Sequence, residues 1–532
     1  MRRALILLIS SLTVACASRA TSTPGVRPPV APNTAAEGPS GAPGAPLAWA
    51  DLGPATFARA RSEKRLVLVD GSAEWCHWCH VMEATTYHDA RVRRLMAARF
   101  VAVKVDVDSN PAFEERYRDW GWPATVLMTA DGEELGVYKG YLPPERMGEI
   151  LEQVIAQVDA SAGAGADADA GAGAMTEQDI AARLDSYWDP AQGSWGRPQK
   201  VPLYQDNAWE LARAAAGDAQ ARARALFALD RQRAIIDPVW GGICQYSTDG
   251  DWAHPHYEKL MPFQAGAIDN YAAAYALTHD PQWLTTAQRV RGFVDRFMTT
   301  PDGAFATTMD ADLHAHEPGK PYLTGRAYYA LDDAHRRALG IPRVDASEYA
   351  RENGLAIAAY VTLYEASGDA TALAAAERAA ARILATHATG RGGVTHGPAA
   401  DAPSGEVLYL ADNAAFGFAL ARLYEATKDP SYLEAARRIA RFVASDLADA
   451  KAGGFFGSTP DPGAVGVFAV RQKPVEDDAM AARFLARLGR LAATDEYRAP
   501  LAGTLAFIRT RDAVASRGRM IGDILLALTE SD

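Results

Sequence analysis

The sequence predicts a multidomain chain, with an α/β domain followed by a larger all-α domain. Its 532 residues are more than one ordinary hydrophobic core organises. Between residues 47 and 158, buried-strand patterns alternate with helical patterns, whereas from Met175 to residue 532 apolar residues recur mainly at helical spacing. An alanine- and glycine-rich linker at 159–174 separates the two regions.

The composition is that of a soluble globular protein. Hydrophobic residues make up 48% of the chain and charged residues 23%. The formal net charge is −12, and no basic run occurs outside Arg2-Arg3. A nucleic-acid partner needs a basic face, so this class of function is excluded.

The N-terminus is predicted to be an export signal, residues 1–16. Met1-Arg2-Arg3 precedes an apolar run at 4–14 that is too short for a permanent membrane span. Ala15-Cys16 then resembles a bacterial lipobox, which predicts lipidation of Cys16; the alternative is a secretory signal cleaved nearby. We therefore expect a lipid-anchored protein of the bacterial cell envelope, facing the periplasm or the exterior, where disulfides persist. Residues 17–46 lack large apolar side chains and are predicted to be a disordered tether.

The first domain has the element order of a known α/β fold. Strands are predicted at 65–70, 100–106, 124–129 and 135–138, and helices at 54–64 and 144–158. Asp131-Gly132 joins the last two strands into a hairpin. A strand-helix-strand start followed by a hairpin and a closing helix resembles the thioredoxin fold.

Two motifs strengthen this resemblance. Leu68-Val69-Asp70, followed by Ala73-Glu74-Trp75-Cys76, resembles the approach to the thioredoxin active site. Trp122-Pro123-Ala124-Thr125 resembles the segment in which a cis proline faces the redox-active cysteines. Cis peptide bonds are largely confined to X-Pro, so we predict a cis Trp122-Pro123 bond.

The sequence Cys76-His77-Trp78-Cys79 is then predicted to be a thiol–disulfide centre. Cys76 would lie at the N-terminus of a helix that runs through Val81 to Tyr87, where the helix dipole favours a thiolate, and would be the attacking sulfur. Cys79 would resolve the mixed disulfide, Asp70 would accept its proton, and protonated His77 would make the disulfide more oxidising. The expected partner is a thiol or disulfide protein, and no cofactor beyond the Cys76–Cys79 disulfide is expected.

Three other interpretations of the cysteine motif are open. Cys-x-x-Cys-His is also the attachment signal of c-type haem, with His80 as axial ligand, but here it follows an apolar strand and precedes a hairpin. A passive disulfide is the second. Zinc bound by these cysteines, His77 and His80 is the third; it is disfavoured because adjacent helical residues point apart, and no metal site is predicted.

A helix-turn-helix phrase recurs in the second domain. Its copies lie at 271–283, 361–369, 421–433 and 488–497. Glycine-rich aromatic segments follow the second helix of most hairpins, at 240–243, 302–305, 392–395 and 453–456. Helical hairpins with long loops at one end predict an (α/α) toroid, in which the loops line the mouth of a central funnel.

Together these motifs resemble the spermatogenesis-associated protein 20 / YyaL family. The segments that carry the resemblance are 76–82, 240–247, 254–260, 308–312, 411–414 and 453–456. The resemblance implies a thioredoxin-like domain fused to a six-hairpin toroid, related in fold to N-acylglucosamine 2-epimerases and some glycosidases. The chain departs from the family pattern at 261–264, at Cys244 and Gln245, and after Asp312, where His314 and His316 stand.

A carbohydrate site in the toroid would need paired acid and base groups. The polar residues that could supply them are His254, His256, Glu258, Asp310, Asp312 and Asp412. Trp240, Trp252, Tyr246 and Phe456 could stack on sugar rings. The alternative is that the carboxylates cap loops or pair with arginines. Cys244 is expected to be a small buried residue.

The leading hypothesis is an exported thiol–disulfide redox protein whose helical domain binds a partner or a glycan. One alternative is a carbohydrate epimerase or hydrolase with an accessory thioredoxin-like domain. Another is a non-catalytic scaffold of the cell envelope.

Overall fold

The computed structural model describes residues 47–160, 173–400 and 407–531. The predicted signal with Cys16, the tether at 17–46 and most of the linker at 159–174 lie outside these residues. Within the described ranges, none of the helices is both long enough and apolar enough to cross a bilayer.

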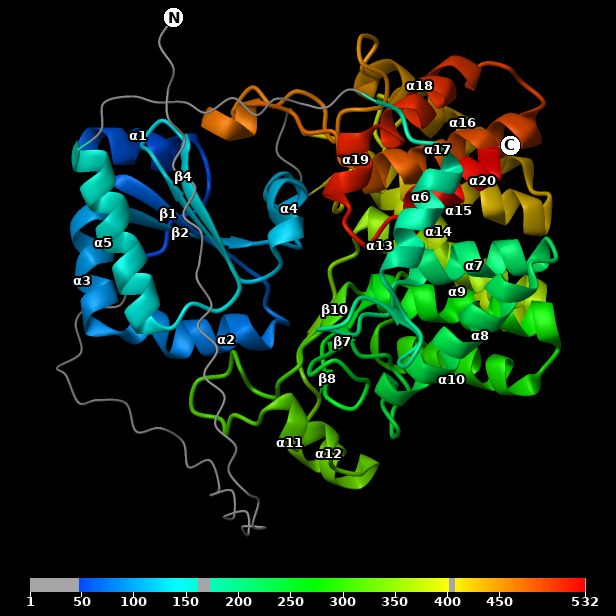
Figure 1. Ribbon diagram of the computed structural model, residues 1–532, viewed down its shortest axis with the longest axis horizontal. Helices are drawn as coiled ribbons and strands as arrows, with labels where there is room; N and C mark the ends of the chain where they lie inside the picture. The colour runs from blue at the N-terminus through cyan, green and yellow to red at the C-terminus, as the bar shows by residue number, and fades with distance from the viewer. Residues whose placement is uncertain (1–46, 161–172, 401–406, 532) are drawn as a thin grey trace, which may run out of the picture. The chain divides into compact units, whose positions relative to one another are not determined.

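A four-stranded sheet forms the centre of the first domain (Figure 1), in the order β2-β1-β3-β4. Strands β1 (Leu66–Ser72) and β2 (Phe100–Asp106) run parallel. Strand β3 (Ala124–Met128) runs antiparallel to β1 and forms a hairpin with β4 (Glu134–Lys139). The thioredoxin-like arrangement predicted from the sequence is confirmed.

Both faces of this sheet are covered by helices. The helices are α1 (Pro54–Glu63) and α4 (Pro111–Tyr117) on one face, and α3 (Ala90–Arg99) and α5 (Pro144–Ala160) on the other. On β1, Val67 packs in one cluster with Phe57 of α1, and its neighbour Leu68 packs in another with Met96 of α3. Successive strand residues point to opposite faces, so the first four residues of β1 are all apolar because both faces are buried.

Helix α2 (His77–Ala84) ends before Tyr87, the last residue of the predicted helix. Cys76 is its N-cap residue, and the side chain of Cys76 accepts a hydrogen bond from the N–H of Cys79. The predicted position of Cys76 at a helix N-terminus is therefore correct, although the helix ends earlier than predicted.

Six inner helices of the second domain form a closed ring. In ring order they are α7 (Tyr204–Ala215), α9 (Met261–Thr278), α13 (Ala350–Ser367), α15 (Leu410–Thr427), α17 (Val475–Ala492) and α20 (Gly522–Ser531). Each packs against the next, and α20 packs against α7, which closes the ring. The (α/α) toroid predicted from the sequence is confirmed.

Outer helices pair with the inner ones. They are α8 (Ala219–Gln232), α10 (Pro281–Phe297), α14 (Ala370–His387), α16 (Pro430–Phe442), α18 (Arg498–Ile508) and α6 (Glu177–Ser186). The first five follow their inner partners in sequence, whereas α6 packs against α20. The sixth pair therefore combines the first helix of the domain, α6, with its last helix, α20.

The recurring phrase is the turn between an inner and an outer helix. Inner helices α9, α13 and α15 end at a left-handed residue, respectively His279, Gly368 and Lys428. The next residue is each time an aspartate whose carboxylate caps the outer helix. Aspartate at this position satisfies N–H groups that have no partner within the helix.

Short helices and strands occupy the loops. They are α11 (Gly325–Tyr329), α12 (Asp333–Leu339), α19 (Arg511–Ser516), β5 (Trp188–Asp189), β6 (Ser194–Trp195), β7 (Tyr246–Ser247), β8 (Pro255–His256), β9 (Lys259–Leu260), β10 (Thr308–Met309) and β11 (Val344–Asp345). Strand β10 pairs antiparallel with β9, Met309 opposite Lys259. Glu258 and Asp310 follow that register and are brought to the same edge.

A buried ion pair fixes α12 to the loop after α8. The guanidinium of Arg336 donates to both carboxylate oxygens of Asp237, at 2.6 and 3.0 Å, and both side chains are buried. The same guanidinium lies 4.9 Å from the ring centres of Trp240 and Tyr329.

Candidate functional site

Cys76 and Cys79 form a buried dithiol at the start of α2. Both are free thiols, with 4% and 7% of their surfaces exposed. The N–H of Cys79 donates to Sγ of Cys76 at 3.3 Å. An N–H donor and the positive end of a helix both stabilise a thiolate at Cys76.

Burial raises the pKa values of both Asp70 and Cys79. The pKa of Asp70 rises to about 6, against the opposing charge of Lys104. The pKa of the Cys79 thiol rises well above its ordinary value, and the neighbouring Cys76 and Asp70 add to the rise. Cys79 is thus held as a thiol, and Asp70 is a buried carboxyl whose charge acts on that thiol.

Pro123 lies in the predicted conformation. The Trp122-Pro123 bond is cis, as the sequence predicted. The backbone oxygen of Trp122 lies 3.8 Å from Sγ of Cys76, close enough for a weak S–H donor contact. This loop therefore covers the sulfur that the sequence assigned as the nucleophile.

His77 is bound by the toroid. Its Nδ1 lies 2.8 Å from Oδ2 of Asp312, and its backbone N–H donates to Oε1 of Glu258 at 3.3 Å. Burial lowers the pKa of His77, but the hydrogen bond and the charge of Asp312, together with the charge of Glu258, outweigh burial and hold the pKa above its ordinary value. The sequence predicted a protonated His77 beside Cys76; the structure adds that a carboxylate of the second domain maintains that charge.

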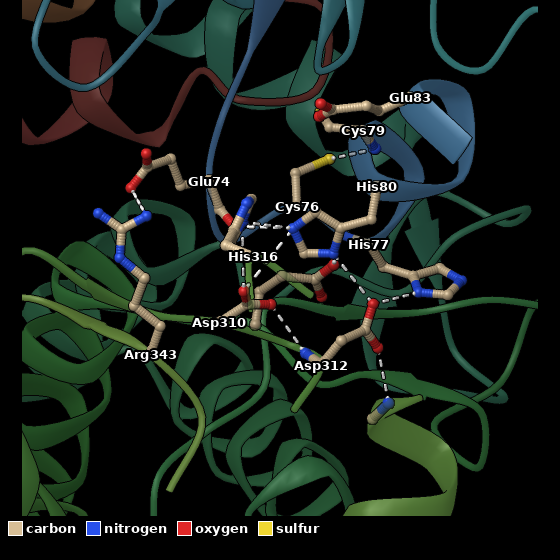
Figure 2. A network of polar contacts seen from close by, with 12 residues as sticks. Glu74, Cys76, His77, Cys79, His80, Glu83, Asp310, Asp312, His316 and Arg343 are labelled. Atoms are coloured by element: carbon tan, nitrogen blue, oxygen red, sulfur yellow. Dashed lines mark hydrogen bonds and ion pairs between the residues drawn. The ribbon is translucent and has the colours of Figure 1, made fainter. Parts of the chain in front are cut away.

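Asp312 is the central acceptor of the contact (Figure 2). Its Oδ2 also accepts from Nδ1 of His80 at 3.1 Å and from the hydroxyl of Tyr322 at 2.8 Å. Its Oδ1 accepts the N–H of Gly325 at 2.7 Å. Burial raises the pKa of Asp312, but the hydrogen bonds from His77 and His80 lower it well below the ordinary range.

The toroid residues predicted as a sugar site do not all lie together. Glu258, Asp310 and Asp312 converge, but they converge on α2 of the thioredoxin-like domain. His256 stacks on Tyr246 with ring centres 4.3 Å apart, and its Nδ1 lies 3.8 Å from Glu258.

His254 and Asp412 lie apart from that convergence. His254 is exposed and bonds to Asp251 at 2.9 Å. Asp412 lies 3.1 Å from Nδ1 of His396, in a cavity of about 200 Å³ that is also lined by Trp75 and Trp122 of the first domain. The six predicted residues thus do not form one site.

Further contacts join the two domains on this side. The N–H of Ala311 donates to the carbonyl of Trp75 at 3.2 Å, and Nε2 of His396 lies 2.8 Å from the carbonyl oxygen of Asp108. Asp108 in turn accepts from the indole N–H of Trp75 at 2.6 Å. His396 and Asp108 were not predicted as site residues, because their contact spans 288 positions of the chain.

Comparisons with known proteins agree with both domains. The family described as "Protein of unknown function, DUF255" matches residues 42–166, and Glycosyl Hydrolase Family 88 matches residues 331–512. Thioredoxin of Listeria monocytogenes is 35% identical over 101 residues, which are 93% of that protein and 19% of this chain. Spermatogenesis-associated protein 20 of Homo sapiens is 26% identical over 319 residues, which are 52% of this chain.

The chain resembles spermatogenesis-associated protein 20 over about half of its own length. The resemblance drawn from the motifs is therefore confirmed. The chain spans 40% of the length of the human relative. Among solved structures, a sugar epimerase from a ruminal bacterium superposes with a TM-score of 0.49 at 13% identity, covering 66% of this chain and 99% of that one.

Proposed function

We propose that this protein is an exported thiol–disulfide oxidoreductase. The observation that carries the proposal is the contact of the Cys79 N–H with Sγ of Cys76 at the N-terminus of α2. Asp70 beneath the pair and cis Pro123 beside it complete a thioredoxin-like centre.

The chemistry follows in two steps. The Cys76 thiolate attacks a disulfide of the partner protein, forms a mixed disulfide and releases one partner thiolate. Cys79 loses its proton to Asp70 and attacks Sγ of Cys76, so that the Cys76–Cys79 disulfide forms and the partner leaves as a dithiol. Two electrons pass to the partner; the reverse sequence oxidises it.

The helical domain would control access to this centre. Asp312 and Glu258 hold His77, and the two cysteines are almost fully buried. Trp78, between the cysteines, keeps 38% of its surface exposed. We propose that a thiol or disulfide protein contacts Trp78 and displaces the toroid from α2 before exchange.

The other interpretations of the motif fit less well. A haem would be attached through Cys76 and Cys79, and both side chains are almost fully buried. This burial does not suit covalent attachment of haem. A passive disulfide has no need of a buried carboxylate beneath the pair.

A carbohydrate activity is the second candidate, favoured by the match of residues 331–512 to Glycosyl Hydrolase Family 88. Against it, Glu258 and Asp312 bond to α2. The cavity with Asp412, about 200 Å³, is also smaller than the roughly 300 Å³ at which small-molecule sites usually begin. A scaffold without catalysis remains the third.

Dithiol exchange with the full chain tests the proposal. Cys76→Ser should abolish reduction of insulin by the protein, whereas Cys244→Ser, a change at a buried cysteine beside Lys259, should leave the rate unchanged. Equal rates for Cys76→Ser and the unaltered protein would refute it. Sugar turnover lost in Glu258→Gln, with exchange intact, would favour the second candidate.

The location of the protein in the cell is inferred from its N-terminal sequence alone. We propose that Cys16 carries a lipid and anchors the protein to the cell envelope. Cys16→Ala should then shift the protein from the membrane fraction to the soluble fraction.

A further inference from the structure

Three polar side chains outside the dithiol meet where α2 contacts the toroid (Figure 2). They are His80 on α2 and, in the loop after β10, Asp310 and His316. The two Nε2 atoms lie 3.1 Å apart, and Oδ2 of Asp310 lies 3.7 Å from each of them. The point equidistant from the corners of this triangle lies about 2.0 Å from each, which is the length of a zinc–nitrogen or zinc–oxygen bond.

Protons alone cannot satisfy the contacts of the two imidazoles. The carbonyl oxygen of Glu74 lies 2.8 Å from Nε2 of His80 and 2.7 Å from Nε2 of His316. A carbonyl only accepts, so both nitrogens would have to carry protons. Those two N–H groups would then face each other across 3.1 Å. Removing either proton places a nitrogen lone pair against the carbonyl oxygen instead.

Asp310 provides an independent observation. Its Oδ1 accepts the N–H of Asp312 at 2.8 Å, but Oδ2, which faces the imidazoles, has no hydrogen-bond partner. Only 2% of Asp310 is exposed, so water cannot easily replace the missing partner. A buried carboxylate oxygen without a donor is costly unless a cation lies beside it.

The geometry points to a binding site for a divalent transition-metal ion of the zinc type, with Nε2 of His80, Nε2 of His316 and Oδ2 of Asp310 as ligands. Two histidines and one carboxylate are a ligand set that zinc accepts, and the carbonyl of Glu74 or a water can take the fourth position. Lone pairs on both Nε2 atoms then point at the ion, which removes the conflict at Glu74.

The surroundings suit a metal ion. Asp312 accepts from Nδ1 of His80, and this carboxylate–histidine arrangement fixes the ring so that Nε2 is free to ligate. A cavity of about 470 Å³ leads to the cluster. It is lined by four acidic residues and one lysine, namely Asp51, Glu74, Glu83, Asp106 and Lys104, a balance that attracts cations.

The ion would join the two domains next to the dithiol. His80 directly follows Cys79 on α2, whereas Asp310 and His316 belong to the toroid. Metal binding would therefore hold α2 in its docked position. This inference does not depend on redox activity, since it concerns binding alone.

Binding of Zn²⁺ and Co²⁺ to the reduced full chain tests the inference. We expect one ion per chain by calorimetry, and a visible Co²⁺ absorption without the near-ultraviolet band that thiolate ligands produce. His316→Ala should weaken binding by about 100-fold or more, since even outer partners of metal ligands are worth 10–100-fold. His80→Gln provides a second variant, and a thermal melt checks that each is folded.

His314→Asn is the matched control. It removes a histidine from the same loop, whose Nδ1 bonds to the carbonyl of Pro321 at 3.1 Å, and binding should be unchanged. Unaltered affinity in both His316→Ala and His80→Gln would overturn the inference. A thiolate band that disappears in Cys76→Ser would also overturn it, because the ion would then be bound by the cysteines.

Discussion

Replacing Asp70 by asparagine should stabilise the first domain while slowing its chemistry. Burial raises the pKa of this carboxyl from 3.8 to about 6, so the folded state binds its proton more tightly than the unfolded state does. The contribution of Asp70 to stability consequently falls as pH rises from about 4 to about 6. At 1.36 kcal/mol per pKa unit, the ionised carboxylate costs about 3 kcal/mol above pH 6.

Hydrogen exchange of β1 amides in the full chain, followed by mass spectrometry, measures this effect locally. We expect Asp70→Asn to raise the opening free energy at pH 7 by up to about 3 kcal/mol, and to have little effect near pH 4. Asp131→Asn, at an exposed carboxylate of the same domain, should change nothing at either pH. A gain that is absent, or equal at both pH values, would refute the reasoning.

Three other predictions concern packing and docking. Gly354→Ala should destabilise the toroid by about 1–3 kcal/mol in urea unfolding, because a Cβ would lie 2.6 Å from the backbone of α15. Arg336→Leu should cost about 3–5 kcal/mol by leaving Asp237 buried and unpaired, whereas Arg337→Ala at an exposed pair should cost less than about 1 kcal/mol. Burial lowers the pKa of His396, but Asp412 outweighs burial and raises the pKa to about 9. The contribution of His396 to the stability of the fold is therefore full below pH 6.5 and is lost as pH rises through about 9. The difference in melting temperature between the unaltered protein and His396→Gln should therefore disappear towards about pH 10; a difference that persists would contradict this assignment.

Local patterns predicted much of the fold. The uninterrupted buried run of β1 and the Asp131-Gly132 turn carry their structures in a few neighbouring residues, and both were predicted. The start of α2 at Cys76 was predicted from the motif, whereas its end at Ala84 comes before the predicted Tyr87. Helix α3 was not predicted, since only Val92 and Met96 of its ten residues are buried.

The surroundings of the dithiol could be predicted only in part. The motif itself gave Cys76, Cys79 and Asp70, which lie within ten positions of one another. The bond of His77 to Asp312 spans 235 positions and depends on the docking of two domains, about which no local pattern gives information. His316 was recognised only as a departure from the family, because its partner His80 lies in the other domain.

The carboxylate of Asp312, with its two imidazole partners, has a consequence for how such a chain is inherited. A gene fragment ending before the toroid would encode a helix with two histidines and no acceptor for them. A fragment beginning after the first domain would leave Asp310 and Asp312 facing water, without the residues around which their loop is built. Recombination that separates the halves therefore damages both products, and the two domains are expected to pass from ancestor to descendant as a single unit.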